Sequence, residues 1–243
     1  MIFLFTDFGT ADVYVGQVKA ALALAAPDIP VIDLLNDVTP FEITPAAHLL
    51  AALSRHLPPQ AVTLAVVDPG VGTERRSIVM RCKDHWFVGP DNGLLAVLAA
   101  RCAKPEVWDI GWRPDALSRS FHGRDLFAPI AARIATGALS GGDLQPRVAL
   151  EVQGDGEDLW QVIYVDHYGN LFTGIRQTSI EESAVLTVGG VGVHHAGIFA
   201  VAPDERPFWY VNSIGLVEIA CNRASAAERL GTSIGEHVTR GAD

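Results

Sequence analysis

The chain has 243 residues, of which 49% are apolar and 19% charged, and this composition supports a sizeable core and excludes a disordered protein. Its formal net charge is −10 and its 18 lysines and arginines are spread along the sequence, which argues against a nucleic-acid-binding surface. Since no stretch of about twenty apolar residues is present, we expect no membrane-spanning segment.

The cysteines and the N-terminal residues predict a cellular compartment. Cys82, Cys102 and Cys221 are far apart, odd in number and lack the CxxC or Cys/His spacing of a metal site. We therefore expect reduced thiols in a cytoplasmic protein. The first residues, MIFLFTDFG, lack the length and the basic flank of a signal peptide, so we expect a soluble protein that is not secreted.

The first part of the chain alternates apolar strand-like segments with helical patterns. The predicted strands are residues 2–5, 31–35, 61–67, 77–81, 86–88 and 107–110. The predicted helices are residues 14–26, 45–56, 93–101 and 126–136. This alternation predicts an α/β domain over residues 1–145, with a mostly parallel, doubly wound, Rossmann-like sheet and helices on both faces. Residues 137–146 have the composition of a linker.

The second part of the chain, residues 146–243, has short β-type runs separated by Gly, Asp, Asn and Pro. These runs are residues 148–152, 159–165, 171–175, 185–188, 191–194, 208–211 and 216–220. Only residues 224–230 have a helical pattern. Short strands at this spacing predict an all-β domain, either a small barrel or a sandwich. A pocket between the two domains is the default ligand site.

The run VVDPGVGTERR, residues 66–76, places charged side chains beside a glycine-rich turn. Asp68 ends an apolar strand, Gly70 and Gly72 follow, and Arg75 comes seven residues after Asp68. In α/β proteins, ligands bind at the carboxyl ends of strands, and glycines let the backbone approach them. Asp68 and Arg75 therefore predict a charged pair at the mouth of a pocket. A salt bridge that only pins the turn is the alternative.

Two other segments of the first domain carry carboxylates at turns. In TDFGTAD, Asp7 follows the first strand and is a candidate for binding ribose hydroxyls or a metal, whereas Asp12 has the position of a helix N-cap. In VGPDNGLL, residues 88–95, the turn signal favours Asp91 or Asn92 as a cap of the next helix.

The segment FHGRDLFAP, residues 121–129, combines an imidazole, a guanidinium and a carboxylate just before a helix. His122 is a candidate catalytic base or orienting group, because histidine changes charge near neutral pH. Arg124 and Asp125 can pair with each other and leave His122 free. A structural histidine is the alternative.

Two segments of the second domain, VDHYGNLFTGI (residues 165–175) and NSIGLVEIA (residues 212–220), carry polar groups in runs that otherwise look like core strands. Such groups need partners when they are buried. They are Asp166, Asn170, Asn212, Ser213 and Glu218. An amide such as Asn170 can bond an adenine edge, and Tyr168 can stack on a flat base. Ordinary hairpin-turn chemistry is the alternative.

In this order and spacing, the six motifs resemble the S-adenosyl-L-methionine hydroxide adenosyltransferase family, the adenosine-forming S-adenosylmethionine hydrolases, which are related to fluorinase and chlorinase. The resemblance extends from Ile2 to about Val238. It implies an α/β N-terminal domain, a C-terminal β-barrel and a homotrimer. In such a trimer the ligand binds between the N-terminal domain of one subunit and the C-terminal domain of the next.

The resemblance also implies a reaction, in which water or hydroxide displaces L-methionine from the ribose C5′ of S-adenosylmethionine and gives adenosine. The matching motif positions make Asp68, Arg75 and His122 the set that holds the nucleophile. The implied substrate contacts are Asp7 at the ribose with Asp12 nearby, Phe41 near the ribose, Asp166 and Ser213 at the methionine end, Tyr168 and Asn170 at the adenine, and Glu218 at the amino-acid end. We expect no metal and no cofactor, with S-adenosylmethionine as the substrate.

The chain departs from the family pattern at two positions. Tyr168 stands where phenylalanine is common, which preserves a stacking face, and Gly174 stands where asparagine is usual. Halogenases resemble the chain but carry tyrosine at the position of Asp68, a threonine-like residue near Val71 and, in fluorinases, serine at that of Gly123, so a halide substrate is disfavoured.

Two alternatives of other classes are open on the residues alone. One is a metal-dependent phosphatase, whose hard-cation site would use aspartates at strand ends with a histidine. Its candidate ligands are Asp7, Asp12, Asp68, Asp91 and His122. The other is a non-catalytic sensor of adenosine or S-adenosylmethionine.

Overall fold

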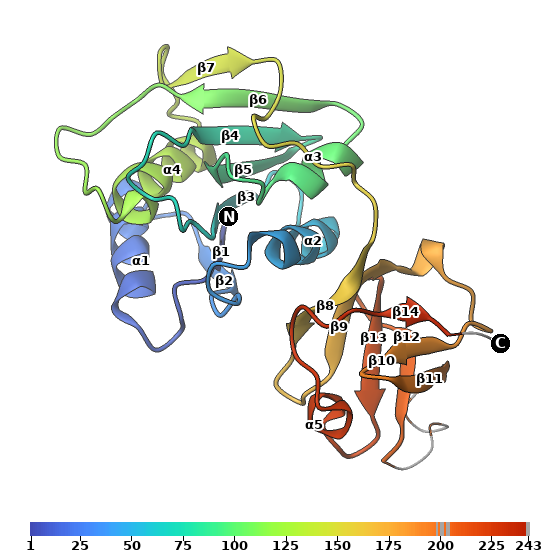
Figure 1. Cartoon of the computed structure of the whole chain (residues 1–243). Helices are drawn as coiled ribbons and strands as arrows, with labels where there is room; N and C mark the ends of the chain where they lie inside the picture. The colour runs from blue at the N-terminus through green and yellow to red at the C-terminus, as the bar shows by residue number, and fades with distance from the viewer. Residues whose placement is uncertain (198, 200–201, 203–204, 242–243) are drawn as a thin grey trace. The chain divides into compact units, whose positions relative to one another are not determined.

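The computed structural model describes residues 1–197, 199, 202 and 205–241. The chain forms two compact units (Figure 1). The first consists of Met1–Leu50 and Leu57–Gly156, and the second of Ala51–His56 and Glu157–Asp243. The division at residues 156/157 falls later than the predicted boundary at 145/146.

The first unit contains a seven-stranded sheet in the order β2-β1-β3-β5-β4-β6-β7. Its strands are β1 (Ile2–Thr6), β2 (Val31–Leu35), β3 (Val62–Val66), β4 (Ser77–Cys82), β5 (His85–Pro90), β6 (Pro105–Ile110) and β7 (Leu144–Arg147). The strands β2, β1, β3 and β5 are parallel, but β4, β6 and β7 join by antiparallel pairs. The sheet is therefore mixed, and the prediction of a mostly parallel, Rossmann-like sheet is not confirmed. Only two residues, Lys83 and Asp84, connect β4 to β5, and such a short connection joins antiparallel strands.

Helices cover both faces of this sheet (Figure 1). They are α1 (Val13–Ala25), α2 (Ile43–Leu53), α3 (Ala96–Arg101) and α4 (Ala128–Thr136), with a π-helical turn at Gly123–Phe127. The 3-10 turn at Ser54–His56, which follows α2, belongs to the second unit. Alternate residues of a strand point to one face, so Leu4 of β1 and Leu64 of β3 share a core with Leu22 of α1 and Ile130 of α4. Asp12 caps α1 as predicted, because its side chain accepts from the Val13 amide at 2.6 Å.

Three local predictions in the first unit are wrong. The supposed linker contains β7, which pairs with β6 at the sheet edge, where Pro146 is tolerated. Residues 148–152 do not form a strand. Neither Asp91 nor Asn92 caps α3, whose N-cap is Leu95; the Asp91 carboxylate accepts the backbone amides of Glu151 at 2.8 Å and Val152 at 3.4 Å instead. These bonds use amide groups that a strand ladder would need and hold the segment on the first unit.

The cysteine prediction is also wrong. Cys82 and Cys102 form a disulfide with Cα atoms 6.0 Å apart, and only Cys221 is free and buried. Cys82 ends β4 and Cys102 follows α3, so the fold brings together two residues that no sequence motif relates.

The second unit contains another seven-stranded sheet, in the order β14-β10-β11-β12-β13-β9-β8. Its strands are β8 (Leu159–Val165), β9 (Leu171–Arg176), β10 (Leu186–Val188), β11 (Val191–His195), β12 (Pro207–Val211), β13 (Leu216–Cys221) and β14 (Thr239–Arg240). A 3-10 turn spans Gln177–Ser179, and α5 spans Ala226–Leu230.

This sheet nearly closes into a barrel. The Val162 amide donates to the Glu236 carbonyl at 2.9 Å and the Val238 amide to the Trp160 carbonyl at 2.9 Å, so β8 approaches the segment before β14. Trp209 lies in the buried core and donates its indole N–H to the Ala184 carbonyl at 2.9 Å. In the described part of the chain, no helix is both long and apolar enough to cross a membrane.

Candidate active site

A buried ion pair lies between the end of β3 and the start of β4. The Nε atom of Arg75 is 2.9 Å from each carboxylate oxygen of Asp68, and Nη2 donates to Oδ2 as well. The Arg75 side chain is 10% exposed and that of Asp68 only 4%. Because a cation and an anion held this way are largely desolvated, the pair orients any small ligand more strongly than a surface salt bridge would.

The conformation of the loop between β3 and β4, which positions Asp68 and Arg75, requires glycine at position 72. The φ of Gly72 is +79°, and a Cβ atom there would lie 2.1 Å from the carbonyl oxygen of Arg119. The loop between β3 and β4 thus packs directly on the chain that leads to His122, and only glycine fits at the crossing.

His122 extends the ion pair into a hydrogen-bonded network of three side chains. Its Nδ1 lies 3.0 Å from Nη2 of Arg75. A guanidinium has no acceptor, so Nδ1 must accept this bond and the ring proton of neutral His122 must be on Nε2. Burial, and then the charge of Arg75, lower the pKa of His122. The imidazole is therefore neutral near pH 7.

Two further residues support Arg75, and the sequence did not point to either. Nη1 of Arg75 donates to Ser77 Oγ at 2.8 Å, and the guanidinium carbon is 5.3 Å from the ring centroid of Phe127. Such a contact between a cation and a ring face is attractive. Ser77 opens β4 and Phe127 ends the π-helical turn, so both look like ordinary core positions in the sequence.

The π-helical turn after His122 fixes that residue. As predicted, Arg124 pairs with Asp125, with Nε donating to Oδ1 at 2.6 Å, and Asp125 also accepts the Ser118 amide at 2.9 Å. His122 is thus left to bond Arg75. At Gly123, a Cβ atom would lie 2.8 Å from the Phe8 ring, so the aromatic side chain occupies the space that a larger residue needs.

These groups border a pocket of about 380 Å³ in the first unit. It is lined by Asp7, Phe8, Asp12, Tyr14, Pro40, Phe41, Val66, Asp68, Val71, Ser120, Phe121, His122 and Gly123. Five predicted residues, Asp7, Asp12, Phe41, Asp68 and His122, therefore meet at one cavity. Arg75 reaches it through its bonds to Asp68 and His122.

Asp7 and several aromatic side chains form the other walls of this pocket. Burial, and then the nearby charge of Asp68, raise the pKa of Asp7, whose Oδ2 accepts the Phe41 amide at 3.3 Å. Phe41 is 69% exposed with φ at 71°, a conformation that non-glycine residues rarely adopt outside functional or strained sites. Tyr14 and Phe121, whose ring centroids lie 5.4 Å apart, form an aromatic wall that no sequence motif predicted.

In the second unit, the segment 166–170 is a turn held by Asp166. Its Oδ1 accepts the amides of Tyr168 at 2.9 Å and Asn170 at 2.8 Å, and its Oδ2 accepts Asn170 Nδ2 at 3.0 Å. Asp166 therefore stabilises the hairpin turn through its side-chain hydrogen bonds, and the Tyr168 side chain is 75% exposed.

Tyr168 and Asn170 border a second pocket of about 490 Å³. Its other lining residues are Phe199, Cys221, Arg223, Ala224 and Ser225, none of which the sequence singled out. Gly169 packs against Ser225, because a Cβ atom would lie 2.1 Å from Ser225 Oγ. This pocket combines aromatic rings with an amide, as a site for a flat polar base would.

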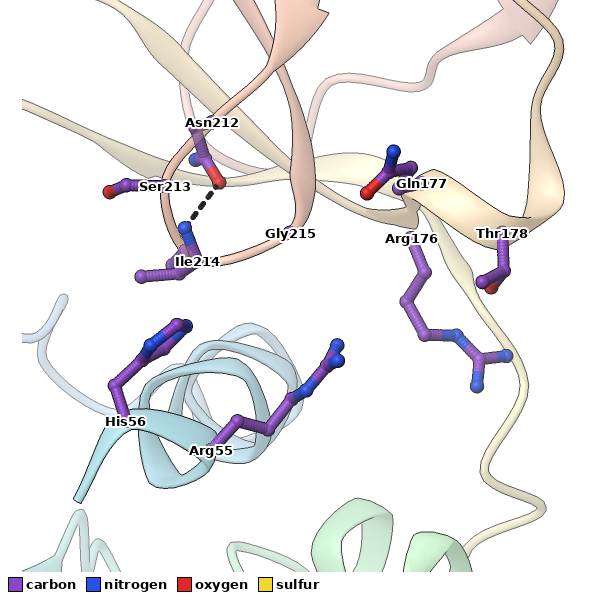
Figure 2. A pocket seen from close by; sticks show the side chains of 9 residues that line it. All are labelled: Arg55, His56, Arg176, Gln177, Thr178, Asn212, Ser213, Ile214 and Gly215. Carbon is purple, nitrogen blue, oxygen red and sulfur yellow. Dashed lines mark hydrogen bonds between the residues drawn. The ribbon is translucent and has the colours of Figure 1, made fainter. Parts of the chain in front are cut away.

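Ser213 lies on the turn between β12 and β13, which lines a third pocket of about 270 Å³ (Figure 2). Its lining residues, all in the second unit, are Arg55, His56, Arg176, Gln177, Thr178, Asn212, Ser213, Ile214 and Gly215. Arg176 pairs with Asp158 through Nε, so Arg55 is the guanidinium among these lining residues that could bind an anionic group such as a carboxylate.

Glu218 is nearly inaccessible, with an exposure of 2%. Its carboxylate accepts the hydroxyl of Tyr210 and, at 3.0 Å, Nδ2 of Asn212. Burial raises the pKa of Glu218, which these two hydrogen bonds oppose. The predicted contact residue is thus already engaged with its neighbours.

The departure at Gly174 has a packing explanation. A Cβ atom there would lie 2.6 Å from the carbonyl oxygen and from the Cβ of Leu159, on the neighbouring strand β8. Any side chain at this position would force β8 and β9 apart. Glycine at position 174 therefore allows β8 and β9 to pair closely in the barrel.

Within the described residues, no group of three or more His, Cys, Asp or Glu side chains is arranged to hold a metal ion. Asp68, one of the ligands of the phosphatase alternative, bonds Arg75 through both oxygens. The Arg75 guanidinium would compete with a cation for this carboxylate.

Comparison with known proteins covers nearly the whole chain. The models of the SAM hydroxide adenosyltransferase N-terminal and C-terminal domains match residues 2–142 and 160–239. An (R)-S-adenosyl-L-methionine hydrolase of Thermus thermophilus is 37% identical over 96% of this chain and 96% of that protein. A fluorinase of an Actinoplanes species is 24% identical over 98% of this chain and 96% of its own. The crystal structure of an uncharacterized conserved protein from Thermotoga maritima superposes with a TM-score of 0.89 at 32% identity, covering 98% of both chains.

Proposed function

Because the chain belongs to the S-adenosyl-L-methionine hydroxide adenosyltransferase family, we propose that it hydrolyses S-adenosyl-L-methionine to adenosine and L-methionine. The membership agrees with the resemblance seen in the motifs. The observation that carries the proposal is the buried chain of Asp68, Arg75 and His122 at the wall of a pocket.

The displacement at C5′ requires no general acid. An oxygen of water or hydroxide bonds to the ribose C5′ while the bond between C5′ and sulfur breaks and its electron pair stays with sulfur. Methionine leaves as a neutral thioether from a sulfonium, so no proton has to be donated to it. The barrier lies in supplying the oxygen nucleophile and aiming it at carbon.

The three residues divide this task. Arg75 supplies positive charge that favours hydroxide over water. Oδ1 of Asp68 accepts only from Nε of Arg75 and has a further lone pair, so Asp68 accepts the hydrogen bond, and then the proton, of the attacking water at Oδ1. Neutral His122 has its Nδ1 occupied and orients the oxygen by donating from Nε2. Base assistance of this kind contributes about a hundredfold to ten-thousandfold to the rate.

The substrate contacts fall into two groups, one in each unit. Asp7, with Asp12 and Phe41 beside it, binds the ribose in the first unit, and its neighbours Phe8 and Tyr14 add an apolar wall. In the second unit Tyr168 and Asn170 bind the adenine. Asp166, Ser213 and Glu218 contact the methionine part of the substrate. Asp166 and Glu218 also hydrogen-bond within the turns at residues 166–170 and 212–216.

We further propose that the protein is a homotrimer in which each site combines the first unit of one subunit with the second unit of the next. Co-expression of Asp68→Asn and Asn170→Ala chains tests this arrangement, because some sites of a mixed trimer would combine two intact halves. The expected result is activity well above that of either variant alone. Mixed oligomers without any recovered activity would refute the shared site, and sedimentation gives the subunit number.

A halide nucleophile fits the pocket poorly. A halide has no hydrogen to donate to the Asp68 carboxylate, which would repel it, whereas water and hydroxide can both donate to that carboxylate. We therefore expect no dependence on chloride or fluoride, and no cofactor or metal requirement, so that activity persists in a chelator. Loss of activity in the chelator, with recovery on adding a divalent metal, would support the phosphatase alternative.

A product assay tests the function directly. The protein is incubated with S-adenosylmethionine in water enriched in oxygen-18, with and without halide, and the products are separated and weighed by mass spectrometry. We expect adenosine that carries the label at its 5′-hydroxyl, together with unlabelled methionine. Intact substrate after a single-turnover incubation would indicate a sensor, and label in methionine would exclude attack at C5′.

A further inference from the structure

Tyr210 lies on β12, directly opposite Glu218 of β13 in the antiparallel ladder. Its hydroxyl donates to Oε1 of Glu218. Burial, and then this bond, raise the pKa of Tyr210 above its ordinary value, so the hydroxyl stays protonated and keeps donating. Neither the sequence motifs nor the proposed substrate contacts include this tyrosine.

Glu218 passes this restraint to the turn that carries Ser213. Its second oxygen accepts Nδ2 of Asn212 at 3.0 Å, which fixes the rotation of the Asn212 amide. The amide oxygen then accepts the backbone amides of Ile214 at 3.1 Å and Leu216 at 3.0 Å (Figure 2). The geometry of the turn thus depends on a carboxylate that Tyr210 holds in place.

The same carboxylate reaches the other polar turn. The Asn170 side chain donates to Asp166 Oδ2 at 3.0 Å and also helps to lower the pKa of Glu218. The Tyr210 ring also lies 5.4 Å from the ring of Phe199, which lines the pocket bordered by Asn170. One buried group therefore connects both turns of the second unit.

We propose that Tyr210 is a positioning residue for substrate binding, which holds Glu218 so that the turns at residues 166–170 and 212–216 keep one arrangement. The proposal rests on the proposed function, because these turns carry Asn170 and Ser213. It predicts that the Tyr210 hydroxyl acts on the affinity for S-adenosylmethionine, since the nucleophile is held in the first unit by other residues.

The test is Tyr210→Phe, which removes one oxygen and keeps the ring. We expect the KM for S-adenosylmethionine to rise about tenfold, as the loss of a hydrogen bond to a charged group would cause, with kcat changed by less than about twofold. Tyr164→Phe is the matched control, because it removes a tyrosine hydroxyl from strand β8 of the same barrel. The control should leave KM unchanged.

The pH dependence of kcat/KM separates positioning from a general loss of stability. Glu218 faces Tyr210, Asn212, Asn170 and the charge of Asp166. The bond from Tyr210 lowers the pKa of Glu218, so its removal raises that pKa, and the carboxylate then gains its proton at a higher pH. The acid limb of kcat/KM in Tyr210→Phe should therefore move to higher pH than in the wild type and in Tyr164→Phe.

A double-mutant cycle with Glu218→Gln completes the test and provides a second variant if Tyr210→Phe does not fold. Glu218→Gln should raise KM and abolish the acid limb that Glu218 causes, and adding Tyr210→Phe should raise KM by much less than tenfold more. Independent, multiplying effects, or a Tyr210→Phe variant with the KM and acid limb of the wild type, would overturn the proposal. If the wild-type protein leaves S-adenosylmethionine intact, the proposed function fails, and calorimetric titration of the same variants with adenosine still tests the positioning.

Discussion

Asp68→Asn separates the charge of the proposed base from its shape. The asparagine keeps an oxygen that can accept from Arg75, but it cannot take a proton from water. The expected fall in kcat is therefore about a hundredfold to ten-thousandfold, the range of base assistance, with KM nearly unchanged. The substitution also leaves the Arg75 guanidinium, which is 10% exposed, without its anion. Breaking a buried ion pair costs about 3–5 kcal/mol, and we expect the lower end because Arg75 keeps Ser77 and Phe127 as partners.

Asp91→Asn is the matched control for this variant. Asp91 is a buried aspartate of the same unit, but it bonds the backbone of residues 151 and 152 and does not line the pocket. This control should lose stability by about 1–3 kcal/mol and keep its kcat. The assays are steady-state hydrolysis of S-adenosylmethionine and urea unfolding followed by circular dichroism. The assignment of Asp68 as the base is refuted if Asp68→Asn retains more than about a tenth of kcat, since base loss should cost at least about a hundredfold.

Three other predictions follow from the first unit. Because burial lowers the pKa of His122 below its ordinary value of 6.5, fewer than half of the rings carry a proton at pH 6.5; the acid limb of kcat should therefore have its half-point below pH 6.5, and a half-point above that pH would contradict a neutral His122. The disulfide should leave one free thiol in the denatured, unreduced protein and three after reduction, and Cys102→Ser should lower the free energy of unfolding by about 3 kcal/mol, whereas three thiols without reductant would contradict the pairing. Gly123→Ser should cost about 1–3 kcal/mol of unfolding free energy through its clash with Phe8, and Phe8→Leu should recover part of that loss; a stable Gly123→Ser protein would show that the ring has room to move.

The sequence predicted best those features that depend on neighbours along the chain. Most of the strands and helices lie within a few residues of their predicted positions, because apolar periodicity and turn residues are local signals. The mixed sheet was missed because strand direction depends on how strands are connected, and the segments at 77–81 and 86–88 looked like any two strands. The disulfide joins residues 20 apart in the chain and depends on the pairing of β4 with β6, which places Cys82 opposite Pro105.

The candidate site shows the same limit at the level of single side chains. Asp68, Arg75 and His122 could be found because each stands in a polar motif at the edge of an apolar segment. Their partners Ser77 and Phe127, and Tyr210 in the second unit, stand in runs that read as core. What distinguishes Tyr210 from its apolar neighbours is a carboxylate on the adjacent strand, and register between strands is not written in either segment alone. The sequence alone therefore identifies the residues that form a site more readily than the residues that hold those side chains in position. In the second unit, the hydrogen-bond partners of Glu218 are therefore the positions where substitutions should change substrate affinity without touching the reacting atoms.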